Sequence, residues 1–352
     1  MRKYMLIFIA ACFYYSGLVK LVRWWAQRDT KSSQNLIILN YHCATGGDLR
    51  HHMLYLRRHY RILHLGAALE ELYAPRKNEP YRKGKLTPLV LTFDDGYRDN
   101  YTHGFALACE LQIPITIFLI PGYIESGDYF WWEEHKRLIH FTQKREITLS
   151  GQTYHLDQHE ERITLSRQID KQLRFASSVS QREAFLELIR KKLAVPSSAV
   201  LEEETALSVT WAEIQKMEKS GWVSFGAHTQ HHPILAYLTD LTELHQEVEL
   251  CREILEEHLG HPIRTFAYPV GQIQHIGENV LESVKEAGYQ WALTTKYGYN
   301  TPQSDPYLLR RIEVDVSQHW LVMAAETAGV WGVFSRMRWI PIIRKYLTNA
   351  SM

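Results

Sequence analysis

Short apolar runs alternate with helical patterns along most of this chain. The runs are rich in β-branched and aromatic residues, and several are continuously apolar, as in parallel strands that helices cover on both faces. The predicted strands are residues 36–41, 89–93, 115–120, 222–226, 265–268, 290–294 and 308–314. Because strands and helices alternate, the pattern predicts an α/β fold, either a barrel or a doubly wound sheet.

Two of the intervening helices have ends that the sequence marks. Thr210 and Glu213 form a capping box, and the helix that they begin is predicted to end near Gly221. A second helix is predicted from about Leu241 to Leu259, and it ends at Gly260 with a proline shortly beyond. Clear helix ends between the predicted strands strengthen the α/β interpretation.

The alternation is interrupted from about residue 128 to residue 208. Residues 147–154 have the pattern of a small hairpin, and two charged helical stretches follow them. We interpret this segment as a mostly helical insertion into a barrel domain that extends over residues 36–317. Residues 1–35 precede that domain as a separate N-terminal segment, and residues 318–352 follow it as an amphipathic, basic tail.

The N-terminal segment has the character of a membrane-associated helix. Residues 4–19 are uncharged and largely apolar, but they fall short of the roughly 20 residues that cross a bilayer comfortably. An apolar stripe continues at helical spacing, with basic residues on the other side, through Leu18, Leu21, Val22 and Trp25. This pattern predicts an interfacial helix or a short anchor, since no cleavage site of a secretory signal peptide follows it. The alternative is a helix that packs on the domain itself.

These features predict a membrane-associated protein of the bacterial cell envelope. If the N-terminal segment spans the bilayer, the denser basic residues after it leave the main domain in the cytoplasm; otherwise the face of the membrane stays open. Residues 9–12 resemble a lipoprotein cleavage box, although the apolar stretch before them is short. The tail mixes aromatic with basic residues, so it fits either a second membrane-facing segment or a packed terminal helix.

Composition excludes several classes of protein. The 352 residues, 45% of them hydrophobic, are enough to bury a large core. The 40 basic residues are balanced by 39 acidic ones, which gives no case for nucleic acid as the partner. The cysteines are scattered and form no C-x-x-C pair, so they predict neither a disulfide framework nor a thiolate zinc site.

Two neighbouring carboxylates directly follow the apolar run of residues 88–93. Gly96 allows the chain to turn there, so Asp94 and Asp95 can both face the mouth of a barrel with different orientations. One carboxylate can bind a metal ion while the other remains free to act as a base. An Asp-Asp-Gly sequence on its own is more typical of a solvated turn, and its position after a buried strand argues against that alternative.

A pair of histidines follows the predicted strand 222–226. His228 and His232 lie four residues apart and precede Pro233, again at the carboxyl end of a strand, where barrel enzymes build their sites. Two imidazoles and the Asp95 carboxylate suit zinc, cobalt or nickel and leave coordination positions open. The alternative is a solvated loop with incidental histidines. His231 is the spare imidazole, and we expect it to point away from the site.

The two motifs resemble those of a known enzyme family. Thr-Phe-Asp-Asp-Gly at residues 92–96 and His-Thr-x-x-His-Pro at residues 228–233 look like the first two motifs of the NodB-type polysaccharide deacetylases, and the similarity covers about residues 36–316 apart from the insertion. The resemblance implies a distorted (β/α)7 TIM-like barrel. It also implies that Asp94 is the general base and that Asp95, His228 and His232 bind one divalent metal ion, with zinc the first choice.

The third family motif departs from the pattern at residues 266–271. The resemblance implies an arginine that orients the base, but Ala267 stands in its place. Arg310 and Arg311, on a strand near the barrel, are candidates to replace it, and Arg311 is our choice. Tyr268, Pro269 and Val270 occupy the positions that the family uses for substrate and oxyanion contacts, where Val270 can still supply a backbone N–H.

The C-terminal leucine-x-histidine motif, which supplies the catalytic acid in the family, is also missing. A circularly permuted branch that acts on exopolysaccharide takes this histidine from the N-terminal strand instead. His42 directly follows the predicted strand 36–41 and is our candidate acid. The alternative is a purely structural histidine.

The sequence therefore predicts a metal-dependent hydrolase that removes acetyl groups, foremost the N-acetyl groups of hexosamines, from a polysaccharide or glycoconjugate. A retaining glycosidase needs two carboxyl groups about 5 Å apart and gives no reason for the histidine pair. Aspartyl phosphotransferases usually carry a D-x-D spacing, which is absent after this strand. The remaining alternative is a catalytically silent, membrane-associated glycan-binding protein with the same fold.

Overall fold

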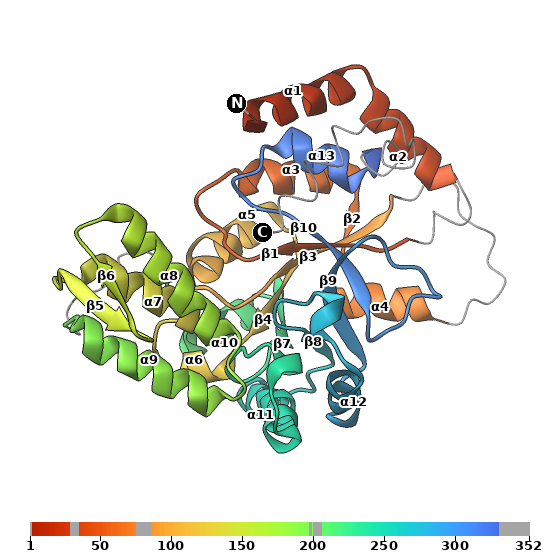
Figure 1. Cartoon of the computed structure of the whole chain (residues 1–352). Helices are drawn as coiled ribbons and strands as arrows, with labels where there is room; N and C mark the ends of the chain where they lie inside the picture. Colours follow the sequence, from red (N-terminus) through yellow and green to blue (C-terminus); the bar gives the residue numbers. More distant parts are fainter. Residues whose placement is uncertain (1, 29–34, 75–85, 197–198, 200–205, 331–352) are drawn as a thin grey trace.

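A closed ring of seven parallel strands forms the centre of the computed structural model (Figure 1). The structure describes residues 2–28, 35–74, 86–196, 199 and 206–330. In ring order the strands are β1 (Ile37–Tyr41), β3 (Pro88–Phe93), β4 (Ile115–Leu119), β7 (Val223–Ala227), β8 (Thr265–Ala267), β9 (Trp291–Tyr297) and β10 (Leu309–Glu313). Since β1 pairs with both β3 and β10, the sheet closes, and the prediction of a distorted TIM-like barrel is confirmed.

Each of the seven predicted strands is present, and most of them combine β-forming residues with burial on both faces. Every residue of β1 and of β4, for example, is buried. An eighth strand was not predicted. The two-residue β2 (Arg61–Ile62) pairs with the start of β3 outside the ring, and it is too short and too polar to give a strand pattern.

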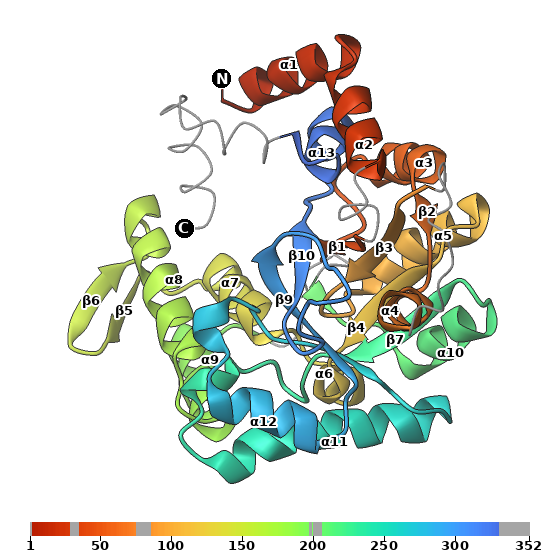
Figure 2. The same ribbon diagram turned by 90° about the vertical axis from the view of Figure 1, so that its right-hand side faces the viewer.

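Helices surround the ring (Figures 1 and 2). They are α3 (Leu49–His59), α4 (Leu65–Tyr73), α5 (Ala106–Leu111), α6 (Pro121–Ser126), α10 (Trp211–Lys219), α11 (Leu241–Leu259) and α12 (Glu278–Glu286), with one π-helical turn, η2 (Asn100–Phe105), and two 3-10 turns, η4 (Leu235–Tyr237) and η5 (Ile273–His275). The Thr210–Glu213 capping box begins α10 as predicted, and α11 ends at Gly260 in the left-handed conformation. The main core lies between these helices and the outward-facing side chains of the strands.

The insertion forms a small helical layer beside the barrel, on the left of Figure 1. It comprises α7 (Trp131–Phe141), the hairpin β5 (Glu146–Leu149) and β6 (Gln152–His155), and the helices α8 (His159–Arg174) and α9 (Val179–Leu193). The predicted hairpin and both charged helices are therefore present. Apolar side chains of α7, α8 and α9, among them Leu138, Ile169 and Ile189, form a separate core that also includes Tyr97 and Tyr123 of the barrel.

The N-terminal helices lie outermost at the top of Figure 1, where α1 (Arg2–Tyr15) and α2 (Leu18–Arg28) cover α13 (Trp320–Thr327). Ala10 and Val19 pack against Leu321 and other apolar side chains of α13, so one face of this segment packs on the domain. The opposite face is exposed: Tyr4 is 77% and Phe8 69% exposed. The segment thus packs on the domain, which is the alternative that the sequence offered, and within the described part of the chain it also has an exposed apolar face.

Among the described residues no single helix has both the length and the apolar character to cross a membrane. By those criteria alone, the bent pair Tyr4–Tyr15 and Leu18–Trp25, whose axes differ by 66°, passes as a unit. The predicted tail begins with α13, and its residues 331–352 lie outside the part of the chain that the structure describes.

Glu326 on α13 makes the stability of this region depend on pH. Burial raises the pKa of its carboxyl to about 7, and the hydrogen bond that Gln318 Nε2 donates over 3.2 Å only partly offsets this. The folded-state pKa thus exceeds the unfolded value of about 4.3, so the folded state loses stability as the pH rises between these two values.

We therefore expect Glu326→Gln to raise the free energy of unfolding by about 1–3 kcal/mol at pH 8 and to leave it unchanged near pH 4. Denaturant titrations of the variant and the wild type at both pH values measure this difference. An effect of equal size at pH 4 and pH 8 contradicts the assignment.

Candidate metal centre and active site

The predicted site residues follow the carboxyl ends of three strands of the ring. Asp94 and Asp95 come directly after β3, His228 after β7, and His42 after β1. The strand pairing continues into the site, because the Asp94 N–H donates to the Tyr41 carbonyl at 2.9 Å. In a parallel barrel these strand ends meet at one rim, so residues far apart in the sequence converge there.

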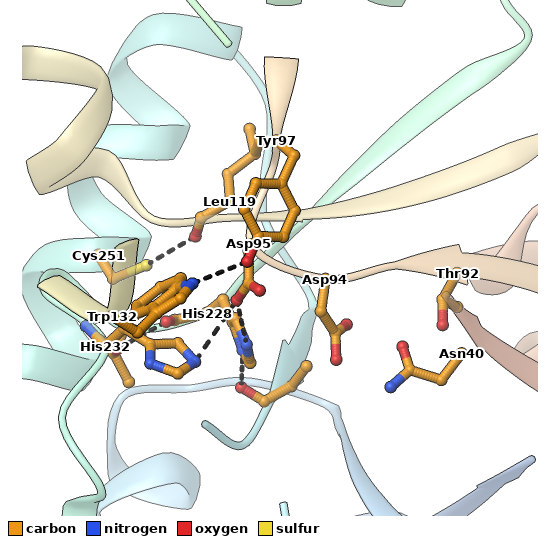
Figure 3. Close-up of polar contacts among 12 residues, drawn as sticks. Asn40, Thr92, Asp94, Asp95, Tyr97, Leu119, Trp132, His228, His232 and Cys251 are labelled. Atoms are coloured by element: carbon orange, nitrogen blue, oxygen red, sulfur yellow. Dashed lines mark hydrogen bonds and ion pairs between the residues drawn. The ribbon is translucent and has the colours of Figure 1, made fainter. Parts of the chain in front are cut away.

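Asp95, His228 and His232 form a buried cluster of three ligand atoms (Figure 3). Asp95 Oδ1 lies 3.4 Å from Nε2 of His228 and 3.4 Å from Nε2 of His232, and all three atoms lie within 4.8 Å of one another. Among the described residues, Asp95 Oδ1 is buried and accepts no hydrogen bond. A buried carboxylate oxygen without a donor needs a cation or water, so this donor set fits a divalent metal ion.

A hydrogen bond of His228 leaves the nitrogen that faces the cluster free to bind a metal ion. His228 Nδ1 lies 2.7 Å from the Ala267 carbonyl, so the Nδ1–H donates there and Nε2 carries the lone pair that faces Asp95. Burial lowers the pKa of His232 to about 3, which keeps that imidazole neutral. Burial also opposes the charged form of His228, but the contact with the Asp95 carboxylate and the charges of Asp94 and Asp95 outweigh it and raise the pKa of that ring.

His231 points away from the cluster, as the sequence analysis expected. Its Nδ1 lies 2.6 Å from Oε1 of Glu247 on α11, and its backbone N–H donates to Oε2 of the same carboxylate at 2.8 Å. The Gln230 N–H donates to the Glu247 backbone carbonyl. Glu247 therefore holds the loop between the two ligand histidines from behind.

Several site residues adopt a backbone conformation that side chains rarely accept. Asp95, Thr229, His232 and Val270 have φ values of 71°, 66°, 58° and 60°. Such conformations cost on the order of 1–3 kcal/mol each and persist where the surrounding structure enforces them. Gly96 follows with φ 68°, which glycine accepts without steric cost, so the turn expected after the two carboxylates is present.

Asp94 pairs with a fully buried arginine from β10, which is separated from β3 by β1 alone. Nη1 and Nη2 of Arg311 donate to the two carboxylate oxygens at 2.7 and 2.8 Å, and Nε donates to the Thr294 carbonyl at 2.9 Å. Arg311 Nη1 also donates to Asn40 Oδ1. Arg311 on β10 thus takes the place of the base-orienting arginine that is missing at Ala267. Arg310, the other candidate, is exposed.

This pairing determines the charge of Asp94. Burial on its own would raise the pKa of the carboxyl, but the charge and hydrogen bonds of Arg311 and the nearby imidazoles hold it below its ordinary value. Asp94 is therefore a carboxylate at neutral pH. Its bidentate contact fixes its orientation beside the three ligand atoms without making it one of them.

His42 and Val270 line the same pocket as Asp94 and Asp95. Asn100 Nδ2 donates to the His42 carbonyl at 2.9 Å and holds the loop that follows β1. The structure thus brings the candidate acid, base and metal ligands to one cavity, about 350 Å³ in volume, which is large enough for a sugar unit.

Tyr268 was wrongly predicted to reach this pocket. Its side chain is buried in the main core, where the hydroxyl donates to the Tyr307 carbonyl at 3.1 Å and the ring packs edge-on against Phe266. Side chains alternate along β8, so Ala267 faces the barrel interior and both aromatic neighbours face outward. Pro269 is not among the residues that line the pocket, and its carbonyl accepts the Gly271 N–H in the turn.

The insertion supplies one wall of the pocket, which the sequence analysis did not assign to particular residues. Trp131, Trp132 and Lys136 of α7 line the cavity together with Asp170 and Arg174 of α8. The Trp132 ring lies 4.6 Å from the His232 ring, and its Nε1 donates to the Tyr97 hydroxyl at 2.7 Å (Figure 3). The run of four aromatic residues at positions 129–132, which leads into α7, was the available signal.

The family model of the polysaccharide deacetylases matches residues 82–292, which include the carboxylate pair, the insertion and the histidine pair. The chain belongs to the polysaccharide deacetylase family. It is a hydrolase of that family, and the resemblance seen in the sequence motifs is confirmed. Among curated protein sequences none matches this chain significantly.

Solved structures with the same fold include further deacetylases. The deacetylase PplD from Streptococcus pyogenes, solved with acetate, superposes with a TM-score of 0.53 at 15% identity, over 83% of this chain and 97% of its own. IcaB from Ammonifex degensii gives 0.52 at 19% identity, over 84% and 97%. The deacetylase domain of BpsB from Bordetella bronchiseptica gives 0.52 at 16% identity, over 82% and 98%. At these identities the matches support the shared fold.

Proposed function

We propose that this deacetylase removes N-acetyl groups from hexosamine residues of a polysaccharide or glycoconjugate and uses one divalent metal ion, zinc before cobalt or nickel. The observation that carries the proposal is the orphaned oxygen of Asp95 between the Nε2 atoms of two imidazoles, beside a separate, ionised Asp94. This arrangement supports a hydrolysis in which the cation and the base are different groups.

Asp95, His228 and His232 would hold the metal ion, which supplies Lewis-acid activation of water and of the acetyl carbonyl when bound. Asp94 accepts a proton from the attacking water, and Arg311 keeps it ionised and oriented. The Val270 N–H donates to the oxygen that becomes negative. His42 protonates the leaving nitrogen as the C–N bond breaks. The products are acetate and a free amine.

We expect acetylated chito-oligosaccharides to release acetate with the wild type, and a chelator to abolish the release until zinc is added back. A colorimetric acetate assay measures both. Release that survives complete removal of the metal contradicts the metal-dependent mechanism. Tight binding of these sugars without acetate release, with the metal loaded, would favour the silent glycan-binding alternative.

We further propose that the outer face of α1 and α2 lies in the interfacial region of a bilayer in the bacterial cell envelope. Aromatic side chains gather on this face, with Tyr15 76% and Trp25 63% exposed, and α2 also carries an exposed Lys20. Tyrosine and tryptophan suit the membrane–water interface, and a lysine adds attraction to anionic lipids. The opposite face packs on α13, which supports a helix pair lying along the membrane.

Vesicles that contain phosphatidylglycerol should co-sediment with the full chain. The double variant Phe8→Ser, Trp25→Ser should reduce the bound fraction by about tenfold, because each change removes a large apolar surface. The control is Leu250→Ser on α11, a similarly exposed apolar side chain that lies outside this face. Equal binding of the double variant and the control contradicts this membrane contact.

A further inference from the structure

A second groove lies on the insertion, outside the pocket of the metal cluster. It is formed by α8, the start of α9 and the link between them, and has a volume of about 450 Å³. The side chains that line it are amides, aromatic rings and one amine: Gln168, Lys171, Gln172, Phe175, Gln181 and Phe185. The Phe175 ring is 49% exposed.

This groove and the active-site pocket are both lined by α8 or the residue that follows it. Asp170 and Arg174 of α8 line the pocket, while Lys171 and Phe175, one residue further along, line the groove. The two sets therefore occupy neighbouring faces at the end of one helix.

A strip of aromatic rings links the two cavities along the barrel side. The Phe175 ring lies 5.0 Å from the Tyr237 ring, and the Tyr237 ring lies 5.8 Å from the His275 ring. His275 belongs to the short turn η5, whose preceding residue, Gln272, lines the active-site pocket. The Ser177 carbonyl accepts the Thr239 N–H at 3.1 Å, so this part of the insertion is anchored to the barrel.

The lining of the groove suits a neutral, hydroxyl-rich chain. Glutamine amides both donate and accept hydrogen bonds, as sugar hydroxyls require, and exposed aromatic faces offer apolar contact for a sugar ring. Among the described residues that line the groove none is a carboxylate, and Lys171 is the one charged side chain. A free amine, which is protonated at neutral pH, would be repelled by that lysine and find no anion to pair with.

We propose that this groove binds neighbouring, still acetylated sugar units of the glycan strand whose acetyl group occupies the active-site pocket. The inference rests on the proposed deacetylase function and names the part of the substrate that the insertion recognises. It explains why the helix that forms a wall of the pocket also forms the floor of a second cavity. Extended, acetylated chains are then better substrates than short ones.

The test compares Phe175→Ala with the wild type on acetylated chito-oligosaccharides of increasing length, with zinc loaded. We expect kcat/KM to rise with chain length in the wild type. The variant should lose about three- to tenfold of kcat/KM on the longest chain through KM, and nothing on the shortest. The matched control is Leu188→Ala on α9, 43% exposed and outside the groove, which should retain the length dependence.

Three results overturn the inference in distinguishable ways. If acetate release rises with chain length equally in the wild type and in Phe175→Ala, the groove does not bind the glycan, and the proposed function stands. A wild type that releases acetate from no length rejects the proposed function and the groove with it. Concentration-dependent dimers that Phe175→Ala dissolves, seen by light scattering alongside an unchanged length dependence, would assign the groove to a second copy of the chain.

Discussion

Replacing Asp94 by asparagine lowers kcat by about 10²- to 10⁴-fold and leaves the metal content unchanged. Asparagine keeps the shape of the side chain and can still accept one hydrogen bond from Arg311, but it cannot take a proton from water. Asp94 is not one of the three convergent ligand atoms, so the metal site survives the change. Acetate release and metal analysis of the purified variant measure the two effects separately.

The contrasting variant is His228→Ala, which removes a ligand nitrogen and should lose both metal and turnover. Asp305→Asn, an exposed aspartate away from the pocket, makes the same chemical change without either effect. Loss of metal from a folded Asp94→Asn protein would place Asp94 among the ligands. If Asp94→Asn keeps more than about a tenth of the wild-type turnover, Asp94 is not the general base.

Replacing Arg311 by leucine impairs both the fold and the catalysis. The change leaves the buried Asp94 carboxylate without its bidentate partner, and breaking a buried ion pair in this way costs about 3–5 kcal/mol of unfolding free energy. The loss of the guanidinium also removes the main influence that lowers the pKa of Asp94. The pKa therefore rises, and the acidic limb of the pH–rate profile moves to higher pH.

Denaturant unfolding and the pH dependence of kcat/KM measure these two effects. Arg311→Lys keeps the positive charge without the bidentate geometry, so it should recover part of the low-pH activity. Arg310→Ala is the matched control, because that neighbouring side chain is exposed and does not contact Asp94. An acidic limb that stays in place in a folded Arg311→Leu protein contradicts the role of Arg311 in setting the charge of the base.

The metal cluster could be predicted from the sequence because its residues obey a local rule. Asp95 and His228 directly follow strands whose apolar runs are unmistakable, and parallel strand ends meet at one rim. His232 follows within the same loop. Their convergence needed nothing beyond strand order and closure of the ring.

The choice between Arg310 and Arg311 needed more than the strand pattern. The register between β9 and β10 shifts between Leu309 and Arg311, so simple alternation does not decide which arginine faces inward. Tyr268 was misplaced for a related reason. The motif indicated that its segment reaches the site, but the side-chain direction depends on the last residues of β8.

The pocket wall built by Trp131 and Trp132 depends on tertiary packing. The sequence of the insertion predicts charged helices and a hairpin. No local sequence pattern indicates that α7 lies against His232. The Trp131 Nε1–H donates to the His232 carbonyl at 3.2 Å, a contact between residues that lie far apart in the chain. The sequence also could not decide whether α1 packs on the domain or on a membrane, because an apolar stripe suits both surfaces.

The most direct test of the metal centre is anomalous X-ray diffraction at the zinc edge from crystals grown with zinc. We expect one strong peak enclosed by Asp95 Oδ1, His228 Nε2 and His232 Nε2, with Asp94 beside it and still paired with Arg311. A peak elsewhere, or no peak between these three atoms in zinc-saturated crystals, would contradict the account.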